Sequence, residues 1–321
     1  MLSTCYDRAH DVFAAFSKSG FAGNDVDSCN GPASGGLRLT AIADSSAFKD
    51  PERMLTQHQA ALTLLQSHLS TPGTLHVSWL DLACGRGQII LSLDRNFSLE
   101  ARAKVNYWAY DIEQGFVRET VKTAKRLGLA SVQSAIGELA DFDRILPPNL
   151  AFDFITITNT VHEIEPARLA GLLVTSVARL TDTGTLFMYD MDRITPAELG
   201  AVPWSRDDIR RIAHRMLDCL GASSYRPEVG LWNHKTCNGW NIQIHRQHLC
   251  VSRADAAPLL SAAVRETRNE IAQLLGGRLS ECRDALETLT LCGAETAAEQ
   301  DERQTLLFEF WALSRAMEHC L

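Results

Sequence analysis

The sequence lacks three features that would each indicate a different class of protein. It has no apolar run near the roughly 18 residues that a membrane-spanning helix needs. Its first residues, Met-Leu-Ser-Thr-Cys-Tyr-Asp-Arg, have neither the charged nor the apolar region of a signal peptide. Its nine cysteines include no Cys-x-x-Cys pair, so neither a disulfide framework nor a cysteine zinc site is predicted. We therefore expect a cytoplasmic protein with reduced thiols.

An excess of positive charge is also missing. The formal net charge is −8, which disfavours nonspecific attraction to nucleic acid or to an anionic membrane. The charge is uneven: residues 201–250 carry seven Lys and Arg against four acids, hence +3, and residues 251–321 carry seven Arg against twelve acids, hence −5. Hydrophobic residues make up 45% of the chain, which is ample for a buried core.

The most informative stretch is Val77 to Gln88. A short apolar run that contains Asp81 is followed by small residues, among them Gly85 and Gly87, and then by the apolar segment Ile89 to Leu93. This pattern predicts a strand, a tight loop and the start of a helix whose free N–H groups face the loop. The glycines allow a tight turn and let the backbone approach a ligand.

The same stretch lacks the third glycine of a dinucleotide fingerprint. Ile90 occupies that position, which argues against a nicotinamide or flavin cofactor. Asp111 ends the next apolar run, twenty-four residues beyond Gly87. A doubly wound sheet places an acid that binds ribose hydroxyls near this position.

Further along the chain, the pattern predicts alternating strands and helices. Strands are expected at Val77–Leu82, Val105–Tyr110, Val132–Ile136, Phe152–Thr158, Gly184–Tyr189, Tyr225–Leu231 and Trp240–His248. Helices are expected at Tyr6–Lys18, from Asp50-Pro51 to Leu69, at Gln88–Phe97, Phe116–Leu127, Pro166–Leu180 and Ser205–Leu220, and over most of Val251–Leu321, with one break at Gly276-Gly277 and another near Gly293. A capping box is expected at Thr195–Glu198, and a near-match to one, with aspartate in the Glu/Gln place, at Ser205–Asp208. A loop is expected at Ser19–Gly36.

The stretch from Asp81 to Gly87 resembles the first motif of class I S-adenosylmethionine-dependent methyltransferases, an acid followed by Gly-x-Gly-x-Gly. Ala83 stands in place of the first glycine, and alanine leaves room at the turn when its φ is negative. The resemblance covers about Asp50 to Leu249. It implies an α/β fold with a seven-stranded, mostly parallel doubly wound sheet, a C-terminal antiparallel hairpin, and N- and C-terminal helical additions.

This resemblance divides the chain into three parts. Residues 1–49 are expected to form an N-terminal helix and flexible loop, residues 50–250 the methyltransferase domain, and residues 251–321 a C-terminal helical appendage.

The resemblance also implies where S-adenosylmethionine binds. Asp111 takes the place of the acid that accepts hydrogen bonds from both ribose hydroxyls. Glu138, with Asp141 in reserve, takes the place of the acid that accepts from the adenine amino group. The expected cofactor-binding residues are Asp81, Ala83, Cys84, Gly85, Gly87, Gln88, Asp111, Ile112, Glu138, Leu139 and Asn159.

Catalytic groups are expected after the fourth strand, where this family places side chains that face the reacting methyl group. Methyl transfer requires an aligned nucleophile, and it requires a base only if that nucleophile arrives protonated. His162 is the candidate general base, and Glu163 would orient it or replace it. The alternative is that His162 packs against the adenine or caps the next helix. No metal is expected, and Asp190 and Asp192 are candidates for contact with the substrate or with a magnesium ion shared with it.

Several other features have two interpretations. Cys84, beside a helix N-terminus, is either an activated thiol or a small residue that fits, and we expect the second. The arginine-rich helix 206–215 is either a phosphate-binding face or an ion-paired surface, and again we expect the second. Trp232 and Trp240 either line an aromatic substrate pocket or belong to the core. The apolar stripe between Leu306 and Met317 covers the core, caps the substrate pocket or pairs with another chain.

We therefore predict an S-adenosylmethionine-dependent methyltransferase that transfers a methyl group to an oxygen or nitrogen nucleophile on a small molecule. A protein or RNA substrate is the second choice. No membrane partner is expected, and the C-terminal helices offer a surface for homo-oligomerisation. The competing hypotheses are a noncatalytic S-adenosylmethionine-binding module with a role in assembly, suggested by Ala83 and the C-terminal tail, and a nicotinamide reductase.

Overall fold

A computed structural model describes residues 51–193, 200–233, 238–249, 256–291 and 296–320 of the chain. The helix expected at Tyr6–Lys18, the loop expected at Ser19–Gly36 and the capping box expected from Thr195 lie outside these residues.

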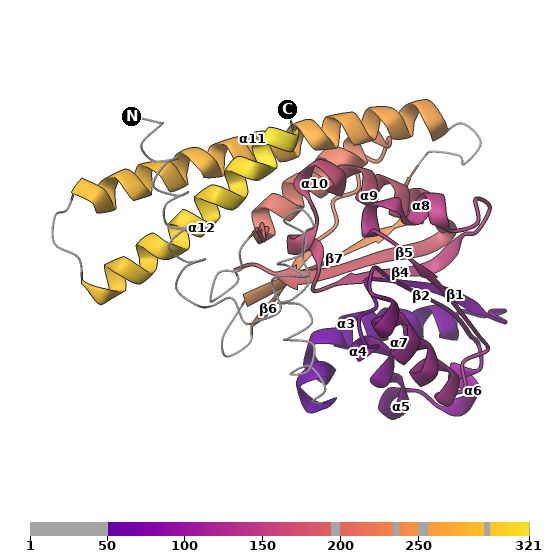
Figure 1. Cartoon of the computed structure of the whole chain (residues 1–321). Helices are drawn as coiled ribbons and strands as arrows, with labels where there is room; N and C mark the ends of the chain where they lie inside the picture. The colour runs from indigo at the N-terminus through magenta and orange to yellow at the C-terminus, as the bar shows by residue number, and fades with distance from the viewer. Residues whose placement is uncertain (1–50, 194–199, 234–237, 250–255, 292–295, 321) are drawn as a thin grey trace.

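A seven-stranded sheet lies at the centre of the protein (Figure 1), in the order β3-β2-β1-β4-β5-β7-β6. Strands β1 to β5 are parallel, whereas β7 is antiparallel to both β5 and β6. The strands are β1 (Val77–Leu82), β2 (Val105–Asp111), β3 (Ser131–Ile136), β4 (Phe152–Thr158), β5 (Leu180–Met191), β6 (Val229–Asn233) and β7 (Asn238–His245). The predicted fold class, a mostly parallel doubly wound sheet with a C-terminal antiparallel pair, is confirmed.

The sheet has a switch point between β1 and β4. Strands β2 and β3 follow on one side of β1, and β4 and β5 lie on the other. Open α/β sheets bind ligands at the carboxyl ends of the strands that flank such a point. We therefore expect a ligand site at this edge of the sheet, formed by the segments that follow β1, β2 and β4.

Several strand boundaries differ from the sequence prediction, and two strand starts differ by four residues. β5 begins at Leu180 rather than Gly184, and its pairing with β4 shifts register between Phe152 and Phe154. β6 begins at Val229 rather than Tyr225, because Pro227 has no N–H to donate to a strand ladder.

Helices cover both faces of the sheet (Figure 1). The helices on one face are α3 (Pro51–Ser70), α4 (Gln88–Leu91), α5 (Leu93–Asn96), α6 (Leu99–Arg102) and α7 (Gln114–Arg126). The helices on the other face are α8 (Phe142–Ile145), α9 (Pro166–Ala178), α10 (Arg206–Cys219), α11 (Ala256–Leu291) and α12 (Ala297–Cys320). A single helix was expected at Gln88–Phe97, whereas the structure has the two short helices α4 and α5, which meet at Ser92.

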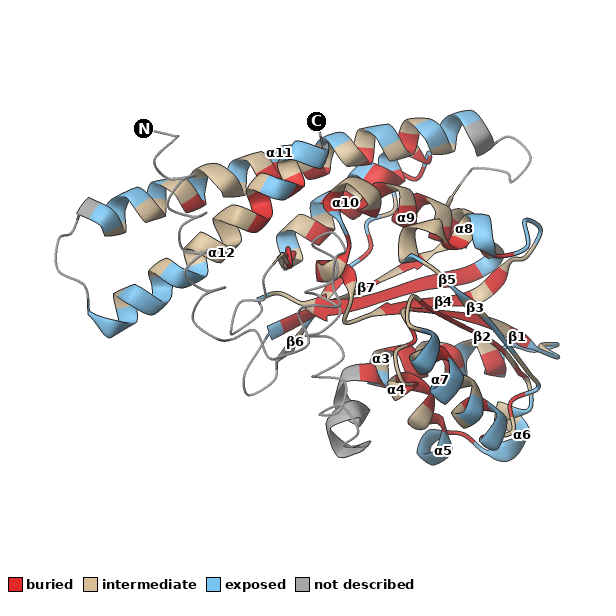
Figure 2. Cartoon of the chain, in the orientation of Figure 1, coloured by how far each residue is buried: buried red, intermediate tan, exposed pale blue. Residues whose placement is uncertain are grey.

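The two layers bury separate clusters of side chains because successive residues of a strand point to opposite faces. In β1, Trp79 belongs to the cluster beneath α3 to α7, whereas Leu80 and Leu82 belong to the cluster beneath α8 to α12. Figure 2 shows the inner strands β1, β2, β4 and β5 buried along most of their length. None of the described helices is both long and apolar enough to cross a membrane.

The capping box predicted at Ser205 is confirmed. The Ser205 hydroxyl accepts from the Asp208 amide and the Asp208 carboxylate accepts from the Ser205 amide. The arginines of α10 form ion pairs rather than an open phosphate-binding face. Arg211 pairs with Glu270 at 2.7 Å and Arg215 with Glu266 at 2.6 Å, both on α11.

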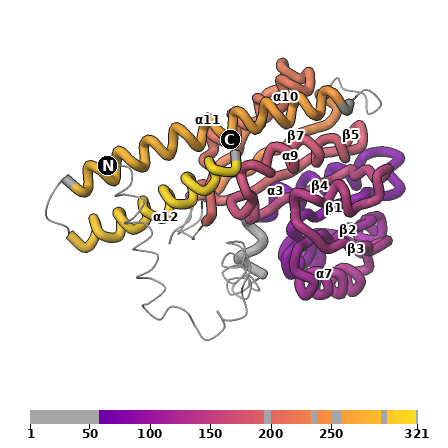
Figure 3. Tube along the Cα trace, turned by 45° about the horizontal axis from the view of Figure 1, so that its top comes forward, coloured from indigo at the N-terminus to yellow at the C-terminus, as the bar shows by residue number. Residues whose placement is uncertain are grey.

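The break predicted at Gly276-Gly277 is wrong, because α11 is one helix of 36 residues (Figure 3). Glycine inside a helix costs about 1 kcal/mol relative to alanine. Here the apolar side chains of Ile271, Leu274 and Leu275 are buried against the domain, and this packing outweighs the low propensity of two glycines. α11 packs on α9, α10 and α12, so the C-terminal helices cover the core, one of the three roles considered for them.

Replacing either glycine of this pair with alanine is expected to stabilise the protein. Gly276→Ala and Gly277→Ala should each raise the free energy of unfolding by about 0.5–1 kcal/mol, because a Cβ at either position meets no atom within 4 Å. Urea denaturation measures the change. As a control, Gly184→Ala should destabilise, since its Cβ would lie 2.7 Å from the Phe152 carbonyl oxygen. A loss of stability in both helix variants would contradict this account of α11.

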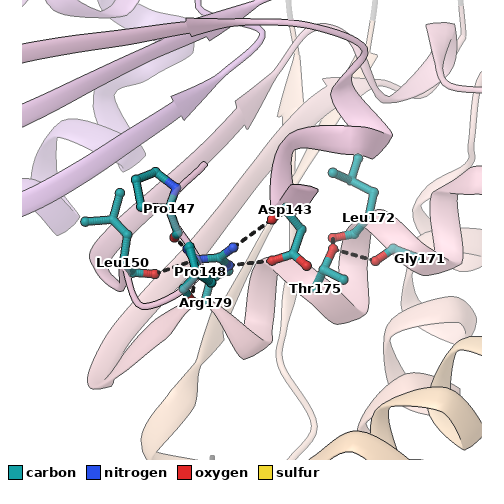
Figure 4. Close-up of polar contacts among 8 residues, drawn as sticks. All are labelled: Asp143, Pro147, Pro148, Leu150, Gly171, Leu172, Thr175 and Arg179. Carbon is teal, nitrogen blue, oxygen red and sulfur yellow. Dashed lines mark hydrogen bonds and ion pairs between the residues drawn. The ribbon is translucent and has the colours of Figure 1, made fainter. Parts of the chain in front are cut away.

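One buried arginine fixes the connection between β3 and β4 (Figure 4). Arg179, 7% exposed, follows α9 and donates through Nη1 to the carbonyl oxygens of Pro147, Pro148 and Leu150 at 2.6, 3.0 and 3.0 Å. Its Nε donates to the Asp143 carboxylate, and its Nη2 to the Asp143 carbonyl oxygen at 2.8 Å. The two prolines have no N–H and cannot form regular backbone hydrogen bonds. The guanidinium supplies the donors for the carbonyl oxygens of this connection instead, and it thereby holds α8 and the start of β4 in place.

Removing the guanidinium should therefore lower the stability of the folded protein. Arg179→Met is expected to lower the free energy of unfolding by about 1–3 kcal/mol, because it leaves several carbonyl oxygens without their donor. Urea denaturation measures the loss. Arg144→Met is the matched control, since the Arg144 side chain is 87% exposed and should change stability by less than about 0.5 kcal/mol. Equal effects of the two substitutions would refute the role assigned to Arg179.

Candidate cofactor and catalytic site

The loop after β1 turns through three residues in the left-handed region. The φ angles are 58° at Ala83, 51° at Gly85 and 80° at Gly87. A Cβ on Gly85 would lie 2.7 Å from the Gln88 Oε1 atom, and one on Gly87 would lie 3.1 Å from atoms of both Ile90 and Thr120. The positive φ favours glycine at both positions, and the packing around Gly87 is tight as well. Ala83 does not have the negative φ at which alanine leaves room at the turn, so this alanine carries backbone strain that glycine would avoid.

Asp111 connects this loop to the end of β2. Its Oδ2 accepts from the Gly85 amide and its Oδ1 from the Glu113 amide, both at 2.9 Å. Burial raises the pKa of the Asp111 carboxyl, and these backbone N–H groups partly oppose the rise. The carboxylate therefore lies against the loop, and one lone pair remains on each oxygen.

Further hydrogen bonds hold the loop to β2 and α7. Thr120 donates to the Gly85 carbonyl oxygen at 2.8 Å, and the Cys84 amide donates to the Tyr110 carbonyl oxygen at 3.0 Å. Cys84 itself is buried, and burial raises the pKa of its thiol well above the ordinary value. This favours the interpretation of Cys84 as a small residue that fits, because an activated thiol needs a lowered pKa.

Asp81 lies deeper than the loop, in a hydrogen-bonded network between three strands. Tyr107 donates to its Oδ2 and Thr156 to its Oδ1, both at 2.7 Å, and the Trp79 indole N–H donates to the Thr156 hydroxyl at 2.9 Å. Asp81 is 1% exposed. Burial raises the pKa of this carboxyl to about 6, although both hydroxyl donors oppose the rise.

The residues expected at the adenine lie beyond β3. The Gly137 amide donates to the Asp111 carbonyl oxygen at 3.1 Å, and the Tyr110 hydroxyl donates to the Glu138 carbonyl oxygen at 2.8 Å. These contacts place Glu138, whose side chain is exposed, beside the end of β2. Asp141 instead pairs with Arg168 at 2.7 Å, which favours Glu138 over Asp141. Ile112 and Leu139 are partly buried, and so is Gln88 in the glycine loop, the loop after β1 that contains Gly85 and Gly87.

His162 and Glu163 lie in a single 3₁₀ turn after β4, η4 (Val161–Glu163). The Asp190 carboxylate, at the end of β5, accepts from both the His162 amide at 2.9 Å and its Nδ1 at 2.7 Å. The other ring nitrogen, Nε2, lies 3.7 Å from the Glu163 carboxylate. His162 is 3% exposed and Asp190 1%, so carboxylates flank both nitrogens of a buried imidazole.

Asn159 begins the connection from β4 to this turn. It has a φ of 54°, and its amide donates to the Tyr189 carbonyl oxygen at 2.9 Å. Asparagine adopts this left-handed conformation more readily than most residues. The connection thus bends sharply at Asn159, at the carboxyl edge of the sheet.

The two tryptophans have different environments. Trp240 is a core residue, 0% exposed, and its indole N–H donates to the Trp204 carbonyl oxygen at 2.7 Å. Trp232 is partly buried and packs edge-on against Tyr189, with ring centroids 5.7 Å apart. An aromatic pocket lined by both residues is therefore not formed. Among the described residues, no group of three or more His, Cys, Asp or Glu side chains is arranged to hold a metal ion.

Sequence reasoning missed the polar partners of these residues. These partners are hydroxyl groups on β2, α7 and β4. Each donates to the loop or to Asp81, and they belong to Tyr107, Thr120 and Thr156. One signal was available, because Thr156 is the cross-strand partner of Asp81 and an acid in a buried strand needs a nearby donor. Asp190 was considered for contact with a substrate or a magnesium ion, whereas its carboxylate contacts His162.

Comparison with known proteins adds information on the fold only. No model of a protein family matches the sequence, and no curated protein matches it. Among solved structures, magnesium protoporphyrin IX methyltransferase from Synechocystis PCC 6803 with bound SAH is 13% identical, over 65% of this chain and 99% of that chain, with a TM-score of 0.45. A SAM-dependent methyltransferase from Aquifex aeolicus is 20% identical, over 63% and 97%, with a TM-score of 0.41. At these identities neither similarity extends beyond the fold.

The left-handed conformation of Ala83 generates a direct test of the loop geometry. Ala83→Val is expected to lower the free energy of unfolding by at least about 1–2 kcal/mol, because a β-branched residue strongly disfavours positive φ. Ala83→Gly is the matched control and should fall within about 0.5 kcal/mol of the wild type, since relief of strain offsets the greater entropy of the unfolded chain. Thermal and urea denaturation measure both. If valine is accepted as readily as glycine, the assigned turn is wrong.

Proposed function

We propose that this protein is an S-adenosylmethionine-dependent methyltransferase that transfers a methyl group to an oxygen or nitrogen nucleophile on a small molecule, with His162 as general base. One observation carries the proposal. A glycine loop fixed by Asp111 and a histidine fixed by Asp190 lie at the same edge of the sheet, after strands β1 and β4 that flank its switch point.

The loop residues fit the cofactor in chemical terms. Each oxygen of Asp111 already accepts one backbone N–H and keeps a lone pair for one hydroxyl of a ribose diol. Gly85 and Gly87 lack side chains where the backbone would approach the ligand. Glu138, on the neighbouring connection, has an exposed carboxylate for an amino group. Bound S-adenosylmethionine supplies an electrophilic methyl group on a sulfonium.

The Asp190 carboxylate determines which nitrogen of His162 accepts a proton. Because Asp190 accepts from Nδ1, that nitrogen carries the hydrogen in the neutral ring, and Nε2 is the basic atom. Nε2 would take the proton of an acceptor O–H or N–H. The resulting imidazolium would be stabilised by Asp190 on one side and by Glu163 on the other. General-base assistance of this kind contributes about 10²–10⁴ in rate.

Calorimetry with S-adenosylmethionine tests the first half of the proposal. The wild type should bind, and Asp111→Ala should weaken binding at least about tenfold because it removes the carboxylate expected at the ribose. Asp153→Asn is the matched control, since Asp153 also accepts from a backbone amide and a threonine hydroxyl but lies at the start of β4, away from the loop. Absence of binding by the wild type would overturn the cofactor assignment.

Transfer of labelled methyl groups tests the second half. The folded protein, labelled S-adenosylmethionine and fractionated small-molecule extracts should yield a methylated product. His162→Asn should reduce this transfer by about 10²-fold or more while cofactor affinity stays within about twofold. Binding without transfer to any small-molecule, protein or RNA acceptor would favour the noncatalytic module instead.

A further inference from the structure

The candidate cofactor site holds two buried carboxylates, and none of the described residues supplies a cation that neutralises them. Asp81 and Asp111 are 1% and 8% exposed. Neither takes part in any of the ion pairs formed between described residues. Buried charges in proteins are normally paired, because an isolated ion is costly to remove from water.

The groups that face Asp81 are neutral or acidic. β2 contributes the Tyr107 hydroxyl and β4 the Thr156 hydroxyl, each donating at 2.7 Å. The loop contributes the Cys84 thiol, whose pKa is raised by burial and also by the charges of Asp81 and Asp111. Asp111 adds a like charge. The described residues around Asp81 thus supply no positive charge that would favour a carboxylate.

Protonation is the way in which such a group avoids an uncompensated charge. Burial, with a further contribution from Asp111, raises the pKa of the Asp81 carboxyl to about 6, and the hydroxyl donors limit the rise. A cation that entered the site would act in the opposite direction and favour the ionised form. S-adenosylmethionine brings a sulfonium and an ammonium.

We propose that binding of S-adenosylmethionine is coupled to the loss of one proton from Asp81, so that cofactor affinity falls as the solution becomes acidic. The inference rests on the proposed function. In the balanced step, the neutral carboxylic acid of the free protein becomes a carboxylate in the complex, and the proton passes to the buffer. No covalent bond of the cofactor changes.

The direction of the effect follows from linkage. Above about pH 7, Asp81 is already ionised in the free protein, and binding releases no proton from it. Below about pH 6, binding must first remove the proton, so the affinity decreases by up to tenfold per pH unit. Between pH 7.5 and pH 5 we expect the dissociation constant to rise about tenfold.

Titration calorimetry with S-adenosylmethionine on the full chain measures this coupling directly. At pH 5.5, experiments in two buffers with different ionisation enthalpies should show release of between half a proton and one proton. At pH 7.5, the same comparison should show little release. A dissociation constant that is the same at pH 5 and pH 7.5, with no proton released at either pH, overturns the proposal.

Two variants identify the titrating group. Tyr107→Phe removes a donor to the Asp81 carboxylate, so the midpoint of the affinity profile should move to higher pH, a shift that a merely structural role of Tyr107 would not produce. Asp81→Asn should flatten the profile. Asp153→Asn, the matched control, should leave the midpoint in place. A midpoint that Tyr107→Phe does not move would assign the proton to another residue and overturn the role of Asp81.

The two proposals fail in different ways. If the wild type does not bind S-adenosylmethionine at any pH between 5 and 7.5, the proposed function fails, and the coupling fails with it. If the wild type binds S-adenosylmethionine at pH 7.5 and the dissociation constant is the same at pH 5, only the coupling fails. Circular dichroism and thermal denaturation at each pH confirm that the folded protein is being titrated.

Discussion

The hydrogen bond from the Gly85 amide to Asp111 joins the first two strands of the sheet at the edge where function is expected. The left-handed turn of the loop directs this amide toward β2, and the carboxylate satisfies a donor that the turn leaves without a ladder partner. Thr120 then fixes the carbonyl oxygen of the same residue. The position of α7, the start of α4 and the direction of the Asp111 side chain all depend on this pair of contacts.

A second fixed point lies after β4. The Asp190 carboxylate accepts from the amide and the ring of the same histidine, and the Val202 amide donates to the carbonyl oxygen of that residue. His162 is therefore held through its backbone and its side chain at once. Such rigidity suits a base that must meet a nucleophile at a defined angle, because misplacement by about 1 Å can cost a hundredfold in rate. The two fixed points, on strands adjacent in the sheet, define the geometry that the proposed transfer requires.

The sequence predicted the order of strands and helices because apolar periodicity and turn residues are local signals. It did not predict features that arise from packing. Gly276 and Gly277 have low helix propensity, yet buried neighbours on α11 keep the helix continuous. The sequence did not indicate the left-handed φ of 58° at Ala83, which the contacts of the loop with β2 and α7 impose. Asp190 and His162 are separated by 28 residues, and no local pattern indicates that they meet.

The arginine that closes the connection between β3 and β4 has a further electrostatic partner. Arg179 is the C-cap residue of α9 and directly follows its last residue, Ala178, so this cationic residue is placed at the negative end of the dipole of that helix, where a cation is favoured. A single carboxylate from Asp143, several carbonyl oxygens and this helix terminus together surround the guanidinium. The burial of a full charge far from the candidate site is thus compensated by partial charges of the backbone. Shortening or tilting α9 at this end would weaken the loop as well as the helix.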